Sequence, residues 1–505
     1  MSAVLAIDAG TTGTTALLVG ADGRVLGRGY REITQHFPHP GEVEHDPEEI
    51  FRVVLAAARE ALQQAKVAPV ALGITNQRET VCVWERHTGR PLHRAIVWQD
   101  RRTEPRTRQL AQQGRAALIR RRTGLIVDPY FSATKIEWML QHVPGLARRV
   151  ASGDAVFGTI DTWLLFRLTN GKSFATDHTN ASRTMLYDIA KRAWDGELLD
   201  LFGVRRDALP EVRSSSGMFG VCRLEHLGVE IPVTGIAGDQ QAALFGQGCV
   251  AAGQAKNTYG TGAFLLLNTG KRRPVSTHGL LTTIACGPKG EPVYALEGSV
   301  FIAGAAIQWL RDGLKIIGNA AETEPLAASV PDSGGVYFVP AFVGLGAPHW
   351  EPNARGTIVG LTRGTTRAHL ARAALEAMAF GTKEVLDAMT ADSKLRLRAL
   401  QVDGGAAAND LLMQFQADLL GVPVARPDIV ETTALGAAAL AGLHVGVWKG
   451  TADFLKGRRF TRFTPGASSR AVRARVEQWQ RAVDAALRWA AAGAPKRPAG
   501  ARKRR

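Results

Sequence analysis

Cysteine is scarce in this chain, and so are long hydrophobic runs. Its four cysteines share no spacing typical of a zinc site or a disulfide framework, and they are Cys82, Cys222, Cys249 and Cys286. We therefore expect reduced core thiols in a cytoplasmic protein. No apolar stretch has membrane-spanning length; the most apolar one, residues 434–448, predicts a buried packing helix. The first predicted strand begins within three residues of Met1, which leaves no room for a signal peptide.

A phosphate-binding loop of the Walker type is also missing. The segment Gly171-Lys172-Ser173 has the ending of such a loop, but Phe166 stands where its first glycine is required. Histidines at positions 36, 39 and 45 form only a weak metal-site pattern, because a loop cluster of histidines needs supporting ligands. Any nucleotide site must therefore use a different kind of turn.

The net charge of +16 raises the question of nucleic-acid binding. Residues 494–505 are rich in proline, glycine and alanine, cannot bury enough apolar surface to fold, and predict a disordered basic tail. Its cations are Lys496, Arg497, Arg502, Lys503, Arg504 and Arg505. Such a tail predicts at most non-specific contact with nucleic acid or anionic lipid, and a plain solvated tail is the alternative. No other segment resembles a nucleic-acid reader.

Length and composition predict a two-domain soluble protein. The chain has 505 residues, which exceeds what one hydrophobic core usually supports, and 45% apolar with 21% charged residues is typical of globular proteins. Residues 48–66 and 469–492 show the periodicity of amphipathic helices. We place the domains at residues 1–249 and 250–493, with the tail at 494–505.

Two glycine-threonine turns, one in each half, carry the strongest signal. An apolar strand ends at Asp8 and is followed by the turn at residues 10–13, and a second strand is followed by the turn at 260–262. Glycine permits close backbone approach, and successive amide hydrogens with threonine hydroxyls suit phosphate oxygens. One such turn alone is equally typical of a hairpin. Its duplication predicts a clamp that holds a polyphosphate from two sides.

Three polar segments, at residues 76–79, 98–102 and 239–241, each follow a predicted strand. Ligands bind beyond strand ends in alternating α/β chains. The alternative readings are an Arg78–Glu79 pair that only neutralises itself and an Asp239 that only caps a helix. The position of Asp239 near the predicted domain junction, where clefts form, favours a binding site.

These segments resemble the FGGY carbohydrate kinase family, which includes glycerol, xylulose and gluconate kinases. Residues 130–139 are similar to one family signature and residues 356–376 to the other. Residues 76–80, 98–103, 159–163 and 238–241 are more discriminating and resemble the glycerol kinases within that family. The resemblance implies an α/β fold of two ribonuclease-H-like, or actin-like, ATPase domains flanking a catalytic cleft. It also implies ATP-dependent phosphorylation of glycerol to sn-glycerol 3-phosphate.

The resemblance assigns roles residue by residue. It implies that Asp239 is the general base and that glycerol is held by Arg78, Glu79, Trp98, Tyr130, Asp239, Gln240 and Phe264. It implies nucleotide contacts from Thr11, Thr12, Gly13, Thr15, Thr261, Gly304, Gln308, Gly405 and Asn409. Asp8 would act on Mg²⁺ through water, and the protein would be a homo-oligomer, dimer or tetramer, with glycerol and ATP as its ligands.

Two positions depart from the pattern of the glycerol kinases. Thr15 stands where those proteins usually carry an arginine, and Gly13 replaces their usual serine. We expect the missing cation to weaken nucleotide binding or to shift charge neutralisation onto magnesium, without abolishing activity. Two alternatives stay open: a kinase for another polyol or a ketose, and an actin-like or chaperone-like ATPase, which would not need Arg78, Trp98 or Asp239.

Overall fold

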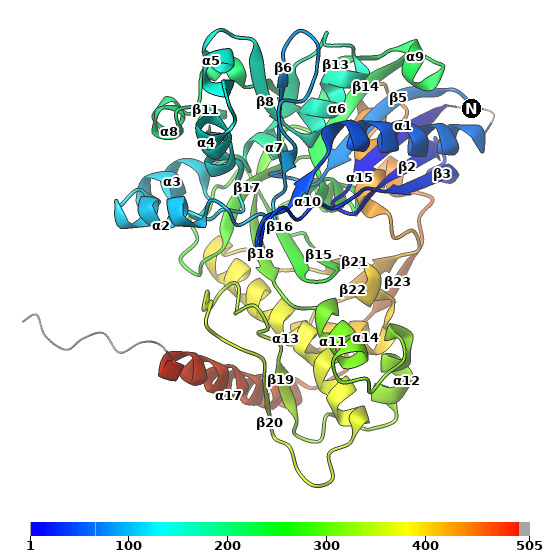
Figure 1. The fold of residues 1–505 in the computed structure, drawn as a ribbon. Coiled ribbons are helices and arrows are strands. Elements are labelled where there is room, and N and C mark those ends of the chain that lie inside the picture. Colours follow the sequence, from blue (N-terminus) through cyan, green and yellow to red (C-terminus); the bar gives the residue numbers. More distant parts are fainter. Residues whose placement is uncertain (1, 66, 494–505) are drawn as a thin grey trace, which may run out of the picture.

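The structure, a computed structural model, describes residues 2–65 and 67–493 (Figure 1). The predicted tail at 494–505 lies outside the described residues. Two large mixed sheets form the centres of two halves of the molecule. Within the described ranges, no helix is both long and apolar enough to cross a membrane.

The first sheet has the strand order β13-β14-β5-β1-β2-β3. Its strands are β1 (Ala3–Ala9), β2 (Gly13–Gly20), β3 (Val25–Glu32), β5 (Pro69–Asn76), β13 (Ser216–Cys222) and β14 (Ile231–Gly238). The first three form an antiparallel meander, with Gly23 at positive φ in the β2–β3 turn. β5 and β14 then add in parallel, so the ends of β1, β5 and β14 meet at one edge of the sheet.

Helix α1 (Pro47–Gln63) covers part of this sheet. Asp46 caps it by accepting a hydrogen bond from the backbone N–H of Glu48 at 2.9 Å, and Pro47 occupies the first turn, where its missing N–H costs nothing. The apolar face packs on β2 and β3 because its small and branched residues recur at helical spacing. The predicted helix covered residues 48–66; the observed helix ends earlier, at Gln63, and residue 66 itself lies outside the described residues.

The second sheet repeats the plan of the first, with the order β17-β18-β16-β15-β21-β22-β23. Its strands are β15 (Ala255–Tyr259), β16 (Ala263–Gly270), β17 (Leu281–Cys286), β18 (Pro292–Val300), β21 (Leu400–Asp403), β22 (Val424–Pro427) and β23 (Phe460–Phe463). β15 pairs antiparallel with β16 and parallel with β21, as β1 does with β2 and β5. Each glycine-threonine turn therefore joins the same two strands of its own sheet.

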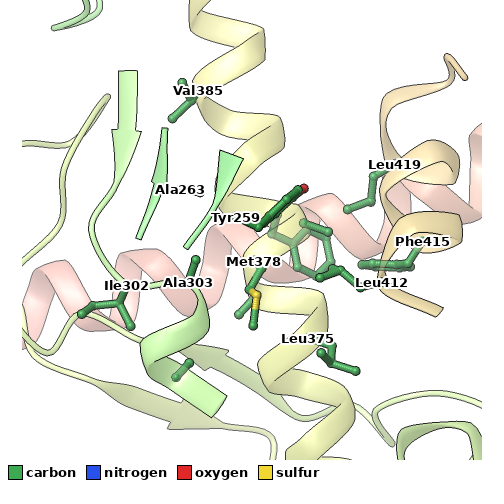
Figure 2. Close-up of a cluster of buried hydrophobic side chains, with 14 of the residues drawn as sticks. Tyr259, Ala263, Ile302, Ala303, Leu375, Met378, Val385, Leu412, Phe415 and Leu419 are labelled. Atoms are coloured by element: carbon green, nitrogen blue, oxygen red, sulfur yellow. The ribbon is translucent and has the colours of Figure 1, made fainter. Parts of the chain in front are cut away.

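Helices pack around the second sheet and enclose the largest core. They are α11 (Gly304–Asp312), α12 (Thr323–Ala328), α13 (Arg367–Ser393), α14 (Asp410–Leu420) and α17 (Ser469–Gly493). The short helix α16 (Thr451–Leu455) instead packs its Phe454 with residues of the first sheet. Figure 2 shows Tyr259 of β15 beside Met378 of α13 and Leu412 of α14 in this core. On α17, Trp479 stacks on Phe380 with ring centroids 5.0 Å apart. The amphipathic helix predicted at 469–492 is thus present, and it packs on the second half.

A smaller sheet, β4-β7-β6-β8, and several short elements complete the first half. The strands are β4 (Glu44–His45), β6 (Val81–Glu85), β7 (Ala95–Ile96) and β8 (Ala155–Thr159). The helices are α2 (Glu104–Gln112), α3 (Ala116–Thr123), α4 (Ser132–His142), α5 (Leu146–Ala151), α6 (Ile160–Leu168), α7 (His178–Ala181), α8 (Gly196–Phe202) and α9 (Leu224–Leu227). Short two-stranded pairs in this half are β9 (Ala175–Asp177) with β12 (Glu211–Arg213) and β10 (Tyr187–Asp188) with β11 (Ala193–Trp194). A third pair, β19 (Tyr337–Val339) with β20 (Thr357–Val359), lies in the second half against α13 and α17.

Helix α15 (Thr432–His444) crosses from the second half onto the first sheet, where it packs against β1, β5, β14 and α10 (Asp239–Gly246) (Figure 1). The crossing is close: a Cβ on Gly436 would lie 1.8 Å from the carbonyl oxygen of Ala242, so only glycine fits. The helix predicted at 434–448 is therefore present and buried through Gly442, but it ends at His444. The division at residue 250 stays a prediction; β15 does open the second sheet, but α15 returns to the first half.

All four cysteines are free and buried, as expected from their spacing. Burial raises the pKa of each thiol, and the thiolate is the nucleophilic form, so these side chains are chemically inert.

Candidate active site

The two glycine-threonine turns line one cavity between the halves. In the first turn the N–H of Gly10 donates to the carbonyl of Gly13 at 3.0 Å, and in the second the N–H of Gly260 donates to the carbonyl of Gly262 at 2.8 Å. The cavity has a volume of about 1120 Å³, and Thr11 of the first turn and Thr261 of the second both line it. The two turns are thus placed as the two sides of a clamp.

A buried histidine supports the first turn through two glutamines. The Gln35 amide donates to the carbonyl of Thr11 at 2.7 Å, and the Gln77 amide donates to the carbonyl of Gly10 at 3.2 Å. His45 lies between them, with Nε2 2.9 Å from Gln35 Oε1 and Nδ1 3.2 Å from Gln77 Nε2. Burial lowers the pKa of His45 to about 4, so the ring is neutral at physiological pH.

One histidine of the weak metal pattern, His45, takes part in this hydrogen-bond network. Among residues 2–65 and 67–493, no three His, Cys, Asp or Glu side chains are grouped so that they could hold a metal ion. His45 is engaged by the glutamines of the first turn instead. The weak metal pattern in the sequence has a structural explanation.

Asp8 and Thr15 lie opposite each other on β1 and β2. Burial and the negative charge of Asp239 raise the pKa of Asp8 to about 7. At Gly13, a Cβ would lie 2.6 Å from the carbonyl oxygen of Arg31 and 2.8 Å from the Tyr30 hydroxyl. Close approach of β3 therefore explains why glycine replaces the usual serine; nothing in the structure explains Thr15.

Arg78 is the centre of the predicted glycerol residues. Its side chain is buried, its Nε lies 3.1 Å from Asp239 Oδ1, and its Nη2 lies 3.4 Å from the Tyr130 hydroxyl. Trp98 packs edge-on against Tyr130, with ring centroids 5.5 Å apart, and donates from Nε1 to Thr11 Oγ1 at 2.9 Å. The structure therefore brings the predicted glycerol residues next to the first phosphate turn.

Glu79 has an unusual backbone conformation, with φ of 61°. The left-handed region is uncommon for a non-glycine residue, and the structure holds it in place: the Ser132 hydroxyl donates to the Glu79 carbonyl at 2.9 Å, and Arg183 Nε donates to its carboxylate at 2.6 Å. Burial raises the pKa of Glu79, while Arg78 and Arg183 oppose that rise.

Asp239 is the first residue of α10, and Gly238 is the N-cap, so Asp239 does not take the capping position that the alternative reading gave it. Burial raises the pKa of Asp239, and Arg78 opposes that rise. Next along the helix, Gln240 accepts a hydrogen bond from Lys256, whose Nζ also donates to Thr258 Oγ1 at 2.7 Å. Burial lowers the pKa of Lys256 to about 8.

Phe264 and Trp98 both line the cavity between the halves, one from each half. Rings contributed from two sides suit the carbon–hydrogen edge of a small polyol. The predicted pair is thus compatible with a substrate held between the two halves.

Of the nine predicted nucleotide residues, Thr11 and Thr12 line the first cavity and Gly13 and Thr15 line neither. The other five line a second cavity of about 440 Å³, which shares Thr261 with the first. Its lining includes Thr261, Gly304, Gln308, Gly405 and Asn409. A Cβ on Gly304 would lie 2.6 Å from the carbonyl oxygen of Gly260, so α11 and the second turn are in close contact. Asn409 caps α14 by accepting from the N–H of Leu412 at 2.8 Å.

Sequence reasoning missed four charged residues that contact or neighbour the predicted ones. Arg183 and Glu297 pair with the predicted glycerol residues, Lys256 contacts Gln240, and Arg311 lines the second cavity. The available signal was a charge inside an apolar strand, at Lys256 in β15 and Glu297 in β18, because charges are rarely buried without a partner.

Both halves of the chain match domains of one family. Residues 3–246 match the FGGY family of carbohydrate kinases, N-terminal domain, and residues 255–445 match the C-terminal domain of the same family. The chain belongs to the FGGY family of carbohydrate kinases. Membership confirms the predicted α/β fold with two ATPase domains, and it argues against a free-standing actin-like or chaperone-like ATPase.

Individual FGGY proteins are similar over nearly the whole chain. A glycerol kinase of Dechloromonas aromatica is 55% identical over 96% of this chain and 98% of that protein. A glycerol kinase of Citrifermentans bemidjiense is 56% identical over 97% of this chain and 99% of that protein. The crystal structure of Plasmodium falciparum glycerol kinase with ADP superposes on this chain with a TM-score of 0.92 and 38% sequence identity. The match covers 96% of this chain and 98% of the chain in that structure.

Proposed function

We propose that this chain transfers the γ-phosphoryl group of ATP to glycerol, producing ADP and sn-glycerol 3-phosphate. The observation that carries the proposal is the clamp: Thr11 and Thr261 line one cavity from two sides, with Arg78, Trp98 and Asp239 beside the first turn. The glycerol kinases of similar sequence, and the ADP complex of one of them, support the choice of acceptor and nucleotide.

The charged and aromatic residues around Arg78 bind glycerol. Three hydroxyls need both donors and acceptors, and charged partners strengthen each hydrogen bond. Arg78 supplies donors, the carboxylates of Glu79 and Asp239 supply acceptors, and the rings of Trp98 and Phe264 face the carbon chain. A polyol lacking one hydroxyl would leave a buried polar group without a partner, which is how such a site rejects it.

Asp239 acts as the general base for the attacking hydroxyl. Its raised pKa makes the carboxylate a better proton acceptor than an exposed aspartate, while Arg78 at 3.1 Å keeps the ionised form favoured enough to be populated. Because phosphoryl transfer proceeds through a loose transition state, positioning and charge neutralisation carry most of the catalysis.

The phosphates of ATP are held by the amides of the two turns and by the hydroxyls of Thr11, Thr12 and Thr261. Asp8, a partly buried carboxylate beside the first turn, fits the preference of Mg²⁺ for few carboxylates and retained water. Bound Mg²⁺ supplies neutralisation of the charge on the phosphates. The second cavity, with Gln308 and Asn409, receives the adenosine end.

The test is nucleotide turnover with and without acceptor. Coupled ADP release should be low with ATP and Mg²⁺ alone and should rise steeply with glycerol; dihydroxyacetone, xylulose and ribulose serve as competing acceptors. A higher kcat/KM for a ketose than for glycerol would favour the second candidate function, a kinase for another polyol or ketose. Release of ADP that no acceptor stimulates would contradict both.

The proposal includes a cytoplasmic location and a homo-oligomeric state, dimer or tetramer. Both rest on the family resemblance. Cell fractionation and sedimentation of the purified chain test them separately.

A further inference from the structure

Glu297 is a buried carboxylate that reaches from the second half of the molecule into the glycerol residues of the first. It lies on β18, and its Oε2 accepts from Arg78 Nη1 at 2.7 Å. Its Oε1 accepts from Arg78 Nη2 and from Arg183 Nη2, each at 3.0 Å. One carboxylate thus binds Arg78 with both oxygens and a second arginine with one of them, a geometry that fixes orientation as well as charge.

The two arginines that Glu297 holds are the ones that orient the predicted glycerol residues. Arg78 lies 3.1 Å from Asp239 and 3.4 Å from the Tyr130 hydroxyl, and Arg183 donates to Glu79 at 2.6 Å. The side chains of Glu297, Arg78 and Arg183 are 3%, 2% and 0% exposed, so water cannot substitute for a lost partner.

The ion pairs of Glu297 with Arg78 and Arg183 are not explained by the stability of the fold alone. Buried ion pairs are often no more stabilising than well-packed apolar residues, because charges lose their hydration. In addition, Arg183 Nη1 is buried without a hydrogen-bond partner among the described residues. Burial acts to raise the pKa of Glu297, but the two arginines outweigh it and lower the pKa to about 2, so Glu297 is ionised across the physiological range. A permanent charge that orients two arginines at the site points to a functional role.

We infer that Glu297 is a positioning residue that aligns Arg78 directly, and Glu79 through Arg183, so that the glycerol end of the site is complete only when the second sheet is docked on the first half. The inference rests on the proposed function and deepens it. Glu297 does not touch the nucleotide cavity, whose lining comes from other segments, so its loss should affect glycerol and spare ATP.

The experiment compares Glu297→Gln and Glu297→Asp with the unmodified chain by steady-state kinetics for each substrate. We expect Glu297→Gln to lower kcat/KM for glycerol by about 10²-fold, because small misplacements at a reacting centre cost about that much, and to change KM for ATP by less than about threefold. Glu297→Asp keeps the charge, but its carboxylate is one methylene shorter and cannot hold both arginines at these distances. The kcat/KM of Glu297→Asp for glycerol should therefore fall between the values of Glu297→Gln and the unmodified chain.

Glu376→Gln is the matched control. Glu376 is also a buried glutamate in the second half that two arginines hold, Arg372 Nε at 2.8 Å and Arg475 Nη1 at 3.4 Å, but it lies on α13 away from the glycerol residues. Its substitution should lower the unfolding temperature without changing kcat/KM for glycerol per folded molecule, which separates loss of a buried pair from loss of alignment.

Each outcome decides the inference. If Glu297→Gln lowers stability as Glu376→Gln does but leaves kcat/KM for glycerol within about threefold, Glu297 is purely structural and the inference is wrong. If Glu297→Gln does not fold, Glu297→Asp carries the test, and unchanged glycerol kinetics would overturn it equally. An unmodified chain without glycerol-dependent ADP release would instead overturn the proposed function, and the inference with it.

Discussion

Replacing Asp239 by asparagine tests the proposed chemistry most directly. The substitution keeps the volume and an oxygen that accepts from the backbone N–H of Gln240, which donates to Asp239 Oδ1 at 2.7 Å. It removes the charge that faces Arg78. Because Arg78 remains bound by both oxygens of Glu297, its position should survive, and the variant should lose the base while retaining most of the site.

The expected size of the effect follows from that geometry. Loss of a general base costs about 10²- to 10⁴-fold in rate, and a loose transition state favours the lower part of this range; 10²-fold corresponds to about 2.7 kcal/mol of activation free energy. A charged hydrogen bond to glycerol becomes a neutral one, so glycerol binding should weaken modestly. ATP binding should be unchanged, because the nucleotide cavity is lined by other segments.

Stability and pH dependence give independent checks. Burial raises the pKa of Asp239 in the folded state, so ionising it costs stability at pH above its ordinary pKa, and the asparagine variant should unfold at no lower temperature near neutral pH. The rate of the unmodified chain should fall as pH falls through that raised pKa, since a protonated carboxyl cannot accept the proton. The residual rate of the variant should lack this acid limb.

Single-turnover phosphorylation of glycerol, measured beside thermal unfolding, is the deciding assay. If Asp239 were only a structural residue of the helix N-terminus, asparagine would replace it with nearly normal turnover. A rate loss below about threefold with unchanged stability would refute its assignment as the base.

Three further predictions address the nucleotide side and the tail. Asp8→Asn should raise the Mg²⁺ concentration for half-maximal rate at least about tenfold at saturating ATP, because a neutral amide binds this cation poorly; an unchanged titration would contradict the magnesium role. Gly304→Ala should raise KM for ATP roughly tenfold, since its methyl would meet the Gly260 carbonyl at 2.6 Å. Gly196→Ala, with open space around its Cβ, is the control, and equal effects would argue against the close contact. Truncation after Ala494 should leave turnover with glycerol intact and reduce retention on heparin; a large loss of activity would show that the tail acts near the cleft.

The sequence alone determined the local features of this protein. Short-range rules were sufficient for the strands β1 to β3, for the helix α1 and for the two turns, because strand periodicity, helical periodicity and glycine-rich turns depend on neighbouring residues. The polar segments at Arg78 and Asp239 were placed correctly because each follows a strand whose end lies at the edge of the same sheet.

Only the tertiary structure decided how these pieces are joined. Glu297 binds Arg78 across 219 positions of sequence, and nothing near Glu297 in the chain indicates which cation it will meet. The crossing of α15 onto the first sheet depends likewise on the contact of Gly436 with Ala242. A buried charge is tolerated only beside its partner, and that partner is set by the packing of the two sheets, which no local pattern encodes.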